Sequence, residues 1–114
     1  MIERIVNTVI YDDEGLMCPN CDSFNLHHRT VTVFDRYEDA EMTHVITVKR
    51  GIPTTHRVPS RGCGNPSTRR DGLTIDFECE NCEAGLTLQI AQHKGSTYLS
   101  WRVKSVTPLK LVNM

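Results

Sequence analysis

The chain has 114 residues, of which 39% are hydrophobic and 6% are aromatic, so it can bury one small core and is expected to form a single domain over residues 1–114. Its formal net charge of -1 excludes a protein that attracts nucleic acid through overall positive charge. No apolar run approaches the roughly 18 residues of a membrane helix, and charged residues interrupt the first ten positions, so neither a membrane span nor a signal peptide is predicted.

The first half of the chain contains three segments with strand character. Residues 2–11 predict an edge strand. Residues 26–34 are rich in β-branched and aromatic side chains and predict a second strand, and residues 43–50 predict its partner. The polar residues 35–40 between them predict a turn or one short helical turn. Residues 51–72 contain three prolines and four glycines without periodicity, which predicts a long loop.

The second half alternates apolar and polar residues with a period of two. Three such runs follow one another, at residues 73–79, 86–91 and 99–103. Cys79 to Gly85 supplies the first connection and Lys94-Gly95 supplies the second, which is a hairpin signal. The pattern predicts an antiparallel three-stranded meander, and the whole chain is predicted to be mostly β.

Two Cys-x-x-Cys pairs form the most specific motif in the chain. Cys18 and Cys21 flank Pro19-Asn20, and Cys79 and Cys82 flank Glu80-Asn81. Two intervening residues let one turn direct both sulfurs at the same ion, and a second turn completes a tetrahedron that leaves no position for water or substrate. The spacing predicts one structural Zn²⁺, although iron satisfies the same ligands. Five cysteines fit a disulfide framework poorly, which favours a reducing, cytoplasmic compartment.

A Cys-Pro-x-Cys turn, a second Cys-x-x-Cys turn between strands and a following meander resemble the zinc ribbon. The resemblance covers about half of the chain and implies an elaborated ribbon on an antiparallel sheet, without implying an activity. The 57 residues between the two pairs exceed what a minimal ribbon needs. The stretches 64–72, 77–82 and 90–95 also resemble uncharacterised zinc-ribbon proteins of actinobacteria and their phages, and this resemblance implies no activity either.

Charge is unevenly distributed along the sequence. Residues 49–70 carry six basic side chains and no acid. Five are arginines, which suit bidentate contact with phosphate or carboxylate: Arg50, Arg57, Arg61, Arg69 and Arg70. One interpretation is an anion-binding loop for nucleic acid or an acidic protein surface. The alternative is a solvated loop whose arginines pair with the protein's own acids.

Two further features bear on catalytic chemistry. Cys63 is the fifth cysteine, in a glycine-rich segment, and is either a spare thiol, a reactive thiol or a substitute ligand. The pair His27-His28, together with the cysteine pairs, permits comparison with HNH-type nucleases, but no ββα segment is evident between the pairs.

The sequence therefore favours a non-catalytic, zinc-stabilised binding module, of the kind found in phage or mobile-element regulators, that contacts nucleic acid through its arginines. A protein adaptor or inhibitor of a host enzyme and, more remotely, a metal-dependent nuclease remain as alternatives.

Overall fold

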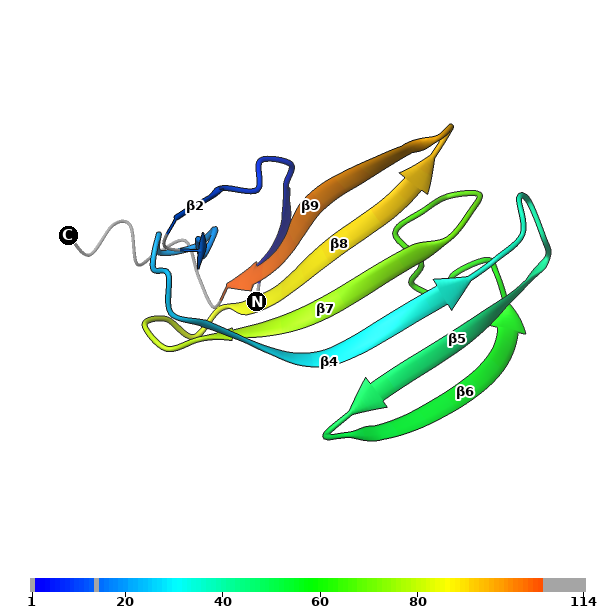
Figure 1. Cartoon of the computed structure of the whole chain (residues 1–114), viewed down its shortest axis with the longest axis horizontal. Helices are drawn as coiled ribbons and strands as arrows, with labels where there is room; N and C mark the ends of the chain where they lie inside the picture. Colours follow the sequence, from blue (N-terminus) through cyan, green and yellow to red (C-terminus); the bar gives the residue numbers. More distant parts are fainter. Residues whose placement is uncertain (1, 14, 106–114) are drawn as a thin grey trace.

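The computed structural model describes residues 2–13 and 15–105 (Figure 1). These residues form a seven-stranded antiparallel sheet in the order β1-β9-β8-β7-β4-β5-β6, and a separate β2-β3 pair. The strands are β1 (Ile2–Val6), β2 (Tyr11–Asp12), β3 (Gly15–Leu16), β4 (Leu26–Asp35), β5 (Met42–Lys49), β6 (Ile52–Pro59), β7 (Gly72–Cys79), β8 (Gly85–His93) and β9 (Ser96–Ser105). Over this part of the chain there is no helix that is long and apolar enough to cross a membrane.

The mostly-β prediction is confirmed, and so is the order of the predicted strands. Strands β7, β8 and β9 form the expected meander, and β4 pairs with β5 as proposed. The first strand ends at Val6 and lies at the edge of the sheet beside β9. A turn follows β4, as the polar residues indicated.

The prediction of an uninterrupted loop over residues 51–72 is wrong for its first third, because Ile52–Pro59 is the edge strand β6. Arg50 and Gly51, with φ of 54° and 78°, form the two-residue turn that joins β5 to β6. Pro53 and Pro59 concealed this strand. The Lys49–Ile52 pair closes the hairpin, so both prolines fall at positions whose backbone nitrogen points away from β5, where no ladder hydrogen bond is lost.

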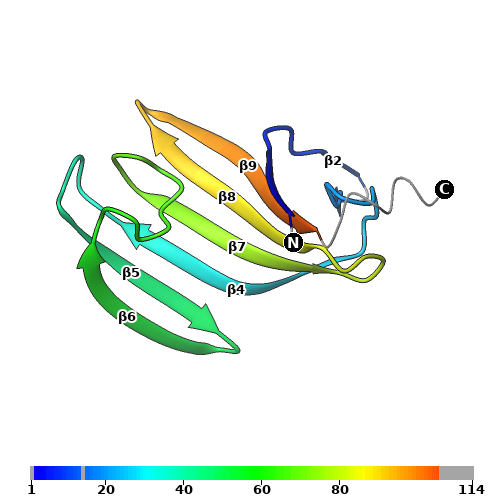
Figure 2. The same cartoon turned by 180° about the vertical axis from the view of Figure 1, so that it is seen from behind.

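The core lies at one end of the sheet. Trp101, Val103 and Leu86 are buried there together with Cys18 and Cys79, and the segment between β1 and β4 packs over them. The loop between β6 and β7 lies at the other end, where Gly64 approaches the ring of the buried Phe34 (Figure 2). Because β7 runs from Gly72 to Cys79, it connects this loop to the cysteine end.

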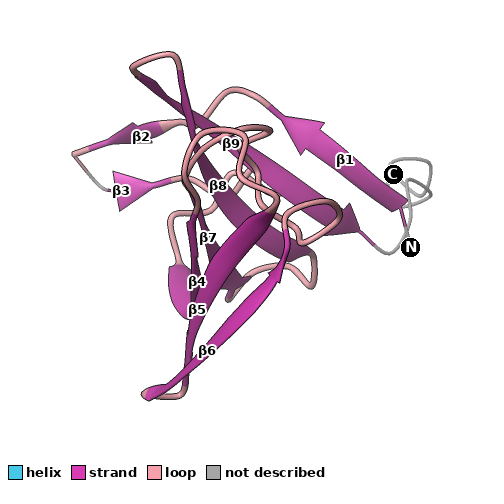
Figure 3. Cartoon of the chain, turned by 90° about the vertical axis from the view of Figure 1, so that its right-hand side faces the viewer, coloured by secondary structure: helices cyan, strands magenta, loops and turns pink. Residues whose placement is uncertain are grey.

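The two faces of the sheet differ in chemistry. Residues paired across neighbouring strands lie on the same face, and the register places a row of aliphatic side chains across five strands, with a second row beside it. We call these residues the open face, because none of them is buried: Val31, Val33, Ile46, Val48, Leu73, Ile75, Leu88, Ile90 and Leu99. Figure 3 shows the twisted sheet from its side, with β2 and β3 projecting at one end.

Candidate metal centre

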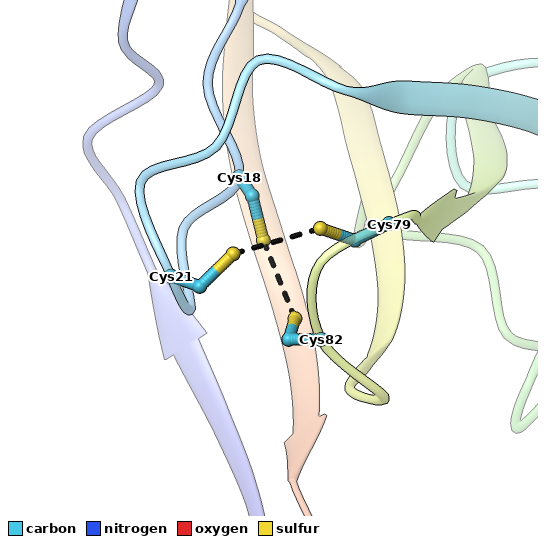
Figure 4. Close-up of side chains that lie close together, drawn as sticks. All are labelled: Cys18, Cys21, Cys79 and Cys82. Carbon is cyan, nitrogen blue, oxygen red and sulfur yellow. Dashed lines mark hydrogen bonds between the residues drawn. The ribbon is translucent and has the colours of Figure 1, made fainter.

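The first cysteine turn lies between β3 and β4. The amide of Cys18 donates a hydrogen bond to the carbonyl of Ser23 at 2.7 Å, and the amide of Asp22 donates to the carbonyl of Cys18 at 3.0 Å. Asp22 adopts a φ of 65°, a conformation that aspartate tolerates better than most residues. These bonds fold the chain back on itself, so that the sulfurs of Cys18 and Cys21 point toward a common centre (Figure 4).

The second turn repeats this geometry at the end of β7. The amide of Asn81 donates to Cys79 Sγ at 3.4 Å, as the amide of Asn20 does to Cys18 Sγ at 3.4 Å. The equivalent bonds explain why the two motifs have the same spacing, because an amide two residues after the first cysteine faces its sulfur. Amide donors stabilise a thiolate, which is the form that binds metal.

The four sulfurs of Cys18, Cys21, Cys79 and Cys82 lie within 4.8 Å of one another. Cys18 Sγ and Cys82 Sγ are 3.8 Å apart, and Cys21 Sγ and Cys79 Sγ are 3.5 Å apart (Figure 4). Sulfurs bound to one tetrahedral ion at about 2.3 Å lie just under 4 Å apart. The predicted ligands are thus brought together from two distant parts of the chain, in a set positioned to bind one metal ion.

Burial sets the protonation of these thiols before metal binds. It raises the pKa of Cys18, which is 0% exposed, and also that of Cys21. Burial acts in the same direction at Cys82, but hydrogen bonds from the Ala84 backbone and from Asn20 outweigh it and lower the pKa to about 7. A metal ion must therefore displace protons from the buried thiols as it binds.

Side chains that the sequence analysis did not identify connect the two turns. Ser23 Oγ donates to Asn81 Oδ1 at 2.6 Å, and Asn25 Nδ2 donates to the same oxygen at 3.1 Å. The Glu80 amide donates to the carbonyl of Asn25 at 3.0 Å. In addition, Arg4 on β1 donates to Asn20 Oδ1 at 3.2 Å. The only sequence signal for this network was the asparagine that occupies the same place in both motifs.

Two acidic residues around the second turn have partners on β4. Glu78 pairs with Arg29 at 3.2 Å, and Glu80 pairs with His27. His28 lies one residue further along β4 and pairs in the ladder with Phe77. Among the described residues, the four cysteines are the only group of three or more potential ligands close enough to hold an ion, so the geometry gives His28 no second metal site.

The five candidate arginines do not form one surface. Arg50 lies in the β5–β6 turn, at the opposite end of that hairpin from Arg57. Arg61 follows β6, while Arg69 and Arg70 precede β7. Over the described residues, Arg50, Arg57 and Arg61 form no ion pair.

Arg69 and Arg70 are instead paired within the protein. Arg69 donates to both carboxylate oxygens of Asp39, at 2.8 and 2.6 Å, and lies 3.0 Å from Glu38. Arg70 lies 3.0 Å from the other oxygen of Glu38. The hydrogen bond from Arg69 holds the pKa of Asp39 below its ordinary value. For these two arginines, the self-paired alternative describes the geometry, and they join the loop before β7 to the turn after β4.

Comparisons of the chain with protein-family models, with curated proteins and with solved structures gave no match. The resemblance to the zinc ribbon therefore depends on the two cysteine turns and the strands that carry them.

Proposed function

We propose that the protein is a non-catalytic binding module whose sheet is held at one end by a structural Zn²⁺. The observation that carries this proposal is the convergence of four cysteine sulfurs within 4.8 Å. Four thiolates complete the coordination of Zn²⁺ and leave no site for substrate, so the ion contributes folding energy rather than catalysis. Free thiols at this site suit a reducing compartment such as the cytoplasm.

The surface best suited to a partner is the open face. It is aliphatic across β5, β4, β7, β8 and β9, and it borders a hollow of about 760 Å³ lined in part by Val33, Ile46 and Leu73. A contiguous aliphatic surface that is partly accessible to solvent, with Val48 and Leu99 exposed, is typical of protein contacts. We therefore favour a protein partner over nucleic acid, which reverses the preference drawn from the arginine-rich sequence, because two of its arginines are bound to acids of the same chain.

Two measurements test this function. Metal analysis should find one zinc per chain, and Cys63→Ser should leave that ratio unchanged. A nuclease-treated extract should then yield a protein, either another copy of this chain or a different one, that is retained by the wild type and lost with Leu99→Asp. Tyr98→Asp is the matched control, because Tyr98 precedes Leu99 on β9, points to the opposite face and is also exposed. Retention that survives Leu99→Asp, or a metal-free native chain, would refute the proposal.

Nucleic acid remains a second candidate partner because of one observation. Lys49 and Arg50 line a hollow of about 600 Å³ beside the bulge in β4, together with Arg29, which is paired with Glu78 in the same lining. If phosphates bind there, affinity should fall steeply with salt, and Arg50→Glu should weaken it more than Arg69→Glu, because Arg69 is already paired. Equal effects of the two substitutions would exclude this site.

A further inference from the structure

We propose that the partner of the open face is a second copy of this chain, packed face to face as in a β-sandwich. The inference rests on the proposed function, because it identifies the occupant of the same surface. It begins with the continuity of the aliphatic rows. Val48, Val31 and Ile75 lead along one row through Leu88 to Trp101, which is 0% exposed.

Only part of this surface is covered by the chain itself. The segment that carries Cys18 covers Trp101 and Val103, whereas Val48 is 39% exposed and Leu99 is 42% exposed. Over the described residues, no second layer lies across the remaining rows, since these strands form one seven-stranded sheet and the β2-β3 pair is at the cysteine end (Figure 1). The surface thus has the composition of a sandwich interior but lacks the facing sheet.

The size of the surface suits a dimer. At the usual strand spacing and rise, each residue on one face occupies about 32 Å², so the nine residues of the open face cover about 290 Å². Six further positions on the same face extend it: His44, Pro53, Thr55, Arg57, Gln92 and Thr97. Together they cover about 480 Å² as a flat footprint, which is smaller than the roughly 800 Å² per partner of a standard interface and fits a dimer that dissociates on dilution.

The geometry of the edge strand favours stacking over extension of the sheet. A second copy could also bind by adding its strands beside β6, but Pro53 and Pro59 occupy positions on the outer side of that strand, where they offer no N–H. At the β6 edge, the prolines therefore favour association through the aliphatic face over extension of the sheet. Such a contact is isologous, so it closes as a dimer and does not propagate.

The test is the mass of the zinc-loaded full-length chain in solution. Sedimentation velocity over a concentration series should give twice the monomer mass of 13.0 kDa, with dissociation on dilution. Val48→Asp and Leu99→Asp should each weaken the dimer at least about tenfold, because each change occurs twice in a symmetric interface. Tyr98→Asp, on the opposite face, should leave the dimerisation constant unchanged. Far-UV circular dichroism would establish that the variants remain folded.

Methyl NMR on dilution locates the contact independently of any variant. The signals of the open face should shift together, and those of Ile2 and Ile5 on the edge strand β1 should not. A monomer at every concentration, or shifts confined to the edge strands, would overturn the dimer. If the chain is monomeric but still retains another protein through Leu99, the dimer is refuted and the proposed function stands. If neither association depends on Leu99, both are refuted.

Discussion

Gly72 provides the most quantitative test of how the loop before β7 is held. It is the first residue of β7 and is buried. A Cβ at this position would lie 2.0 Å from Asn65 Oδ1 and 2.9 Å from Pro66 Cδ. We therefore predict that Gly72→Ala is strongly destabilising, although alanine is ordinarily the better residue in a strand.

The cost follows from what Asn65 does. Its Oδ1 accepts a hydrogen bond from the Ser67 amide at 2.9 Å, and its Nδ2 donates to the carbonyl of Arg70 at 2.8 Å. Moving Asn65 away from an added methyl group breaks both bonds, at about 1 kcal/mol each. The displacement of Pro66 adds about 1 kcal/mol of overpacking. The expected loss is about 3 kcal/mol, or about 12 °C in Tm for a domain of this size.

Gly85→Ala is the matched control. Gly85 is likewise the first residue of its strand, but an added Cβ would meet Lys104 Cβ at 3.6 Å, an ordinary contact. Thermal and urea unfolding of zinc-loaded protein should place Gly85→Ala within about 0.5 kcal/mol of wild type. Asn65→Ala combined with Gly72→Ala should cost less than the sum of the two single changes. Equal stabilities of Gly72→Ala and Gly85→Ala would show that the loop does not pack on β7 as described.

Three further predictions concern the two ends of the sheet. Removing the metal with a chelator should shift the emission of Trp101, the single tryptophan, to longer wavelength, because its ring shares a core with Cys18 and Cys79. The Cys63→Ser variant should respond identically. An unchanged spectrum would show that the core does not depend on the metal. Zinc affinity should fall as the pH is lowered through neutrality, because burial raises the pKa of Cys18 and Cys21 and protonated thiols do not bind metal; competition titrations that give a pH-independent affinity would contradict this. In urea unfolding, Ser60→Ala should lower the free energy of unfolding by about 2 kcal/mol and Thr43→Val by about 1 kcal/mol. The reason is that the Ser60 hydroxyl bonds both the Ala40 carbonyl and the buried Thr43 hydroxyl, each at 2.7 Å. A larger loss for Thr43→Val than for Ser60→Ala would contradict these bonds.

The cysteine ligands and most strands could be predicted because their signals are local. Two intervening residues define each metal turn, and alternation defines β7, β8 and β9 without reference to the rest of the chain. The strand β6 was not predicted because proline normally argues against a strand. An edge strand tolerates proline only where the proline nitrogen faces away from the neighbouring strand. The direction that each nitrogen faces is set by the β5–β6 turn at Arg50 and Gly51, whose signal is weaker than an Asn-Gly pair.

The arginines illustrate a second limit of sequence reasoning. A run of basic residues indicates anion binding only if those residues are not paired within the protein. Arg69 and Arg70 are paired with acids that lie about thirty residues earlier, in the turn after β4. The open face could not be predicted from the sequence either. Alternation identified aliphatic positions in each strand, but their alignment into rows depends on register, which includes a bulge in β4 between His28 and Val31.

The contrast between the two faces argues that the aliphatic rows are not incidental. On the opposite face, Thr54, Thr47 and Thr32 lie side by side, and the row continues through Thr74, Gln89 and Ser100. Threonine keeps the β propensity of a branched side chain and adds a hydroxyl group. Every member of this row is at least partly accessible to water except Thr74, which is 8% exposed. If both faces were exposed to solvent, rows of threonine and other polar residues would be expected on both. Threonine is concentrated on one face, although Thr55 and Thr97 lie on the other, and the matching rows of that other face are aliphatic. This difference indicates that the aliphatic face is made to be covered.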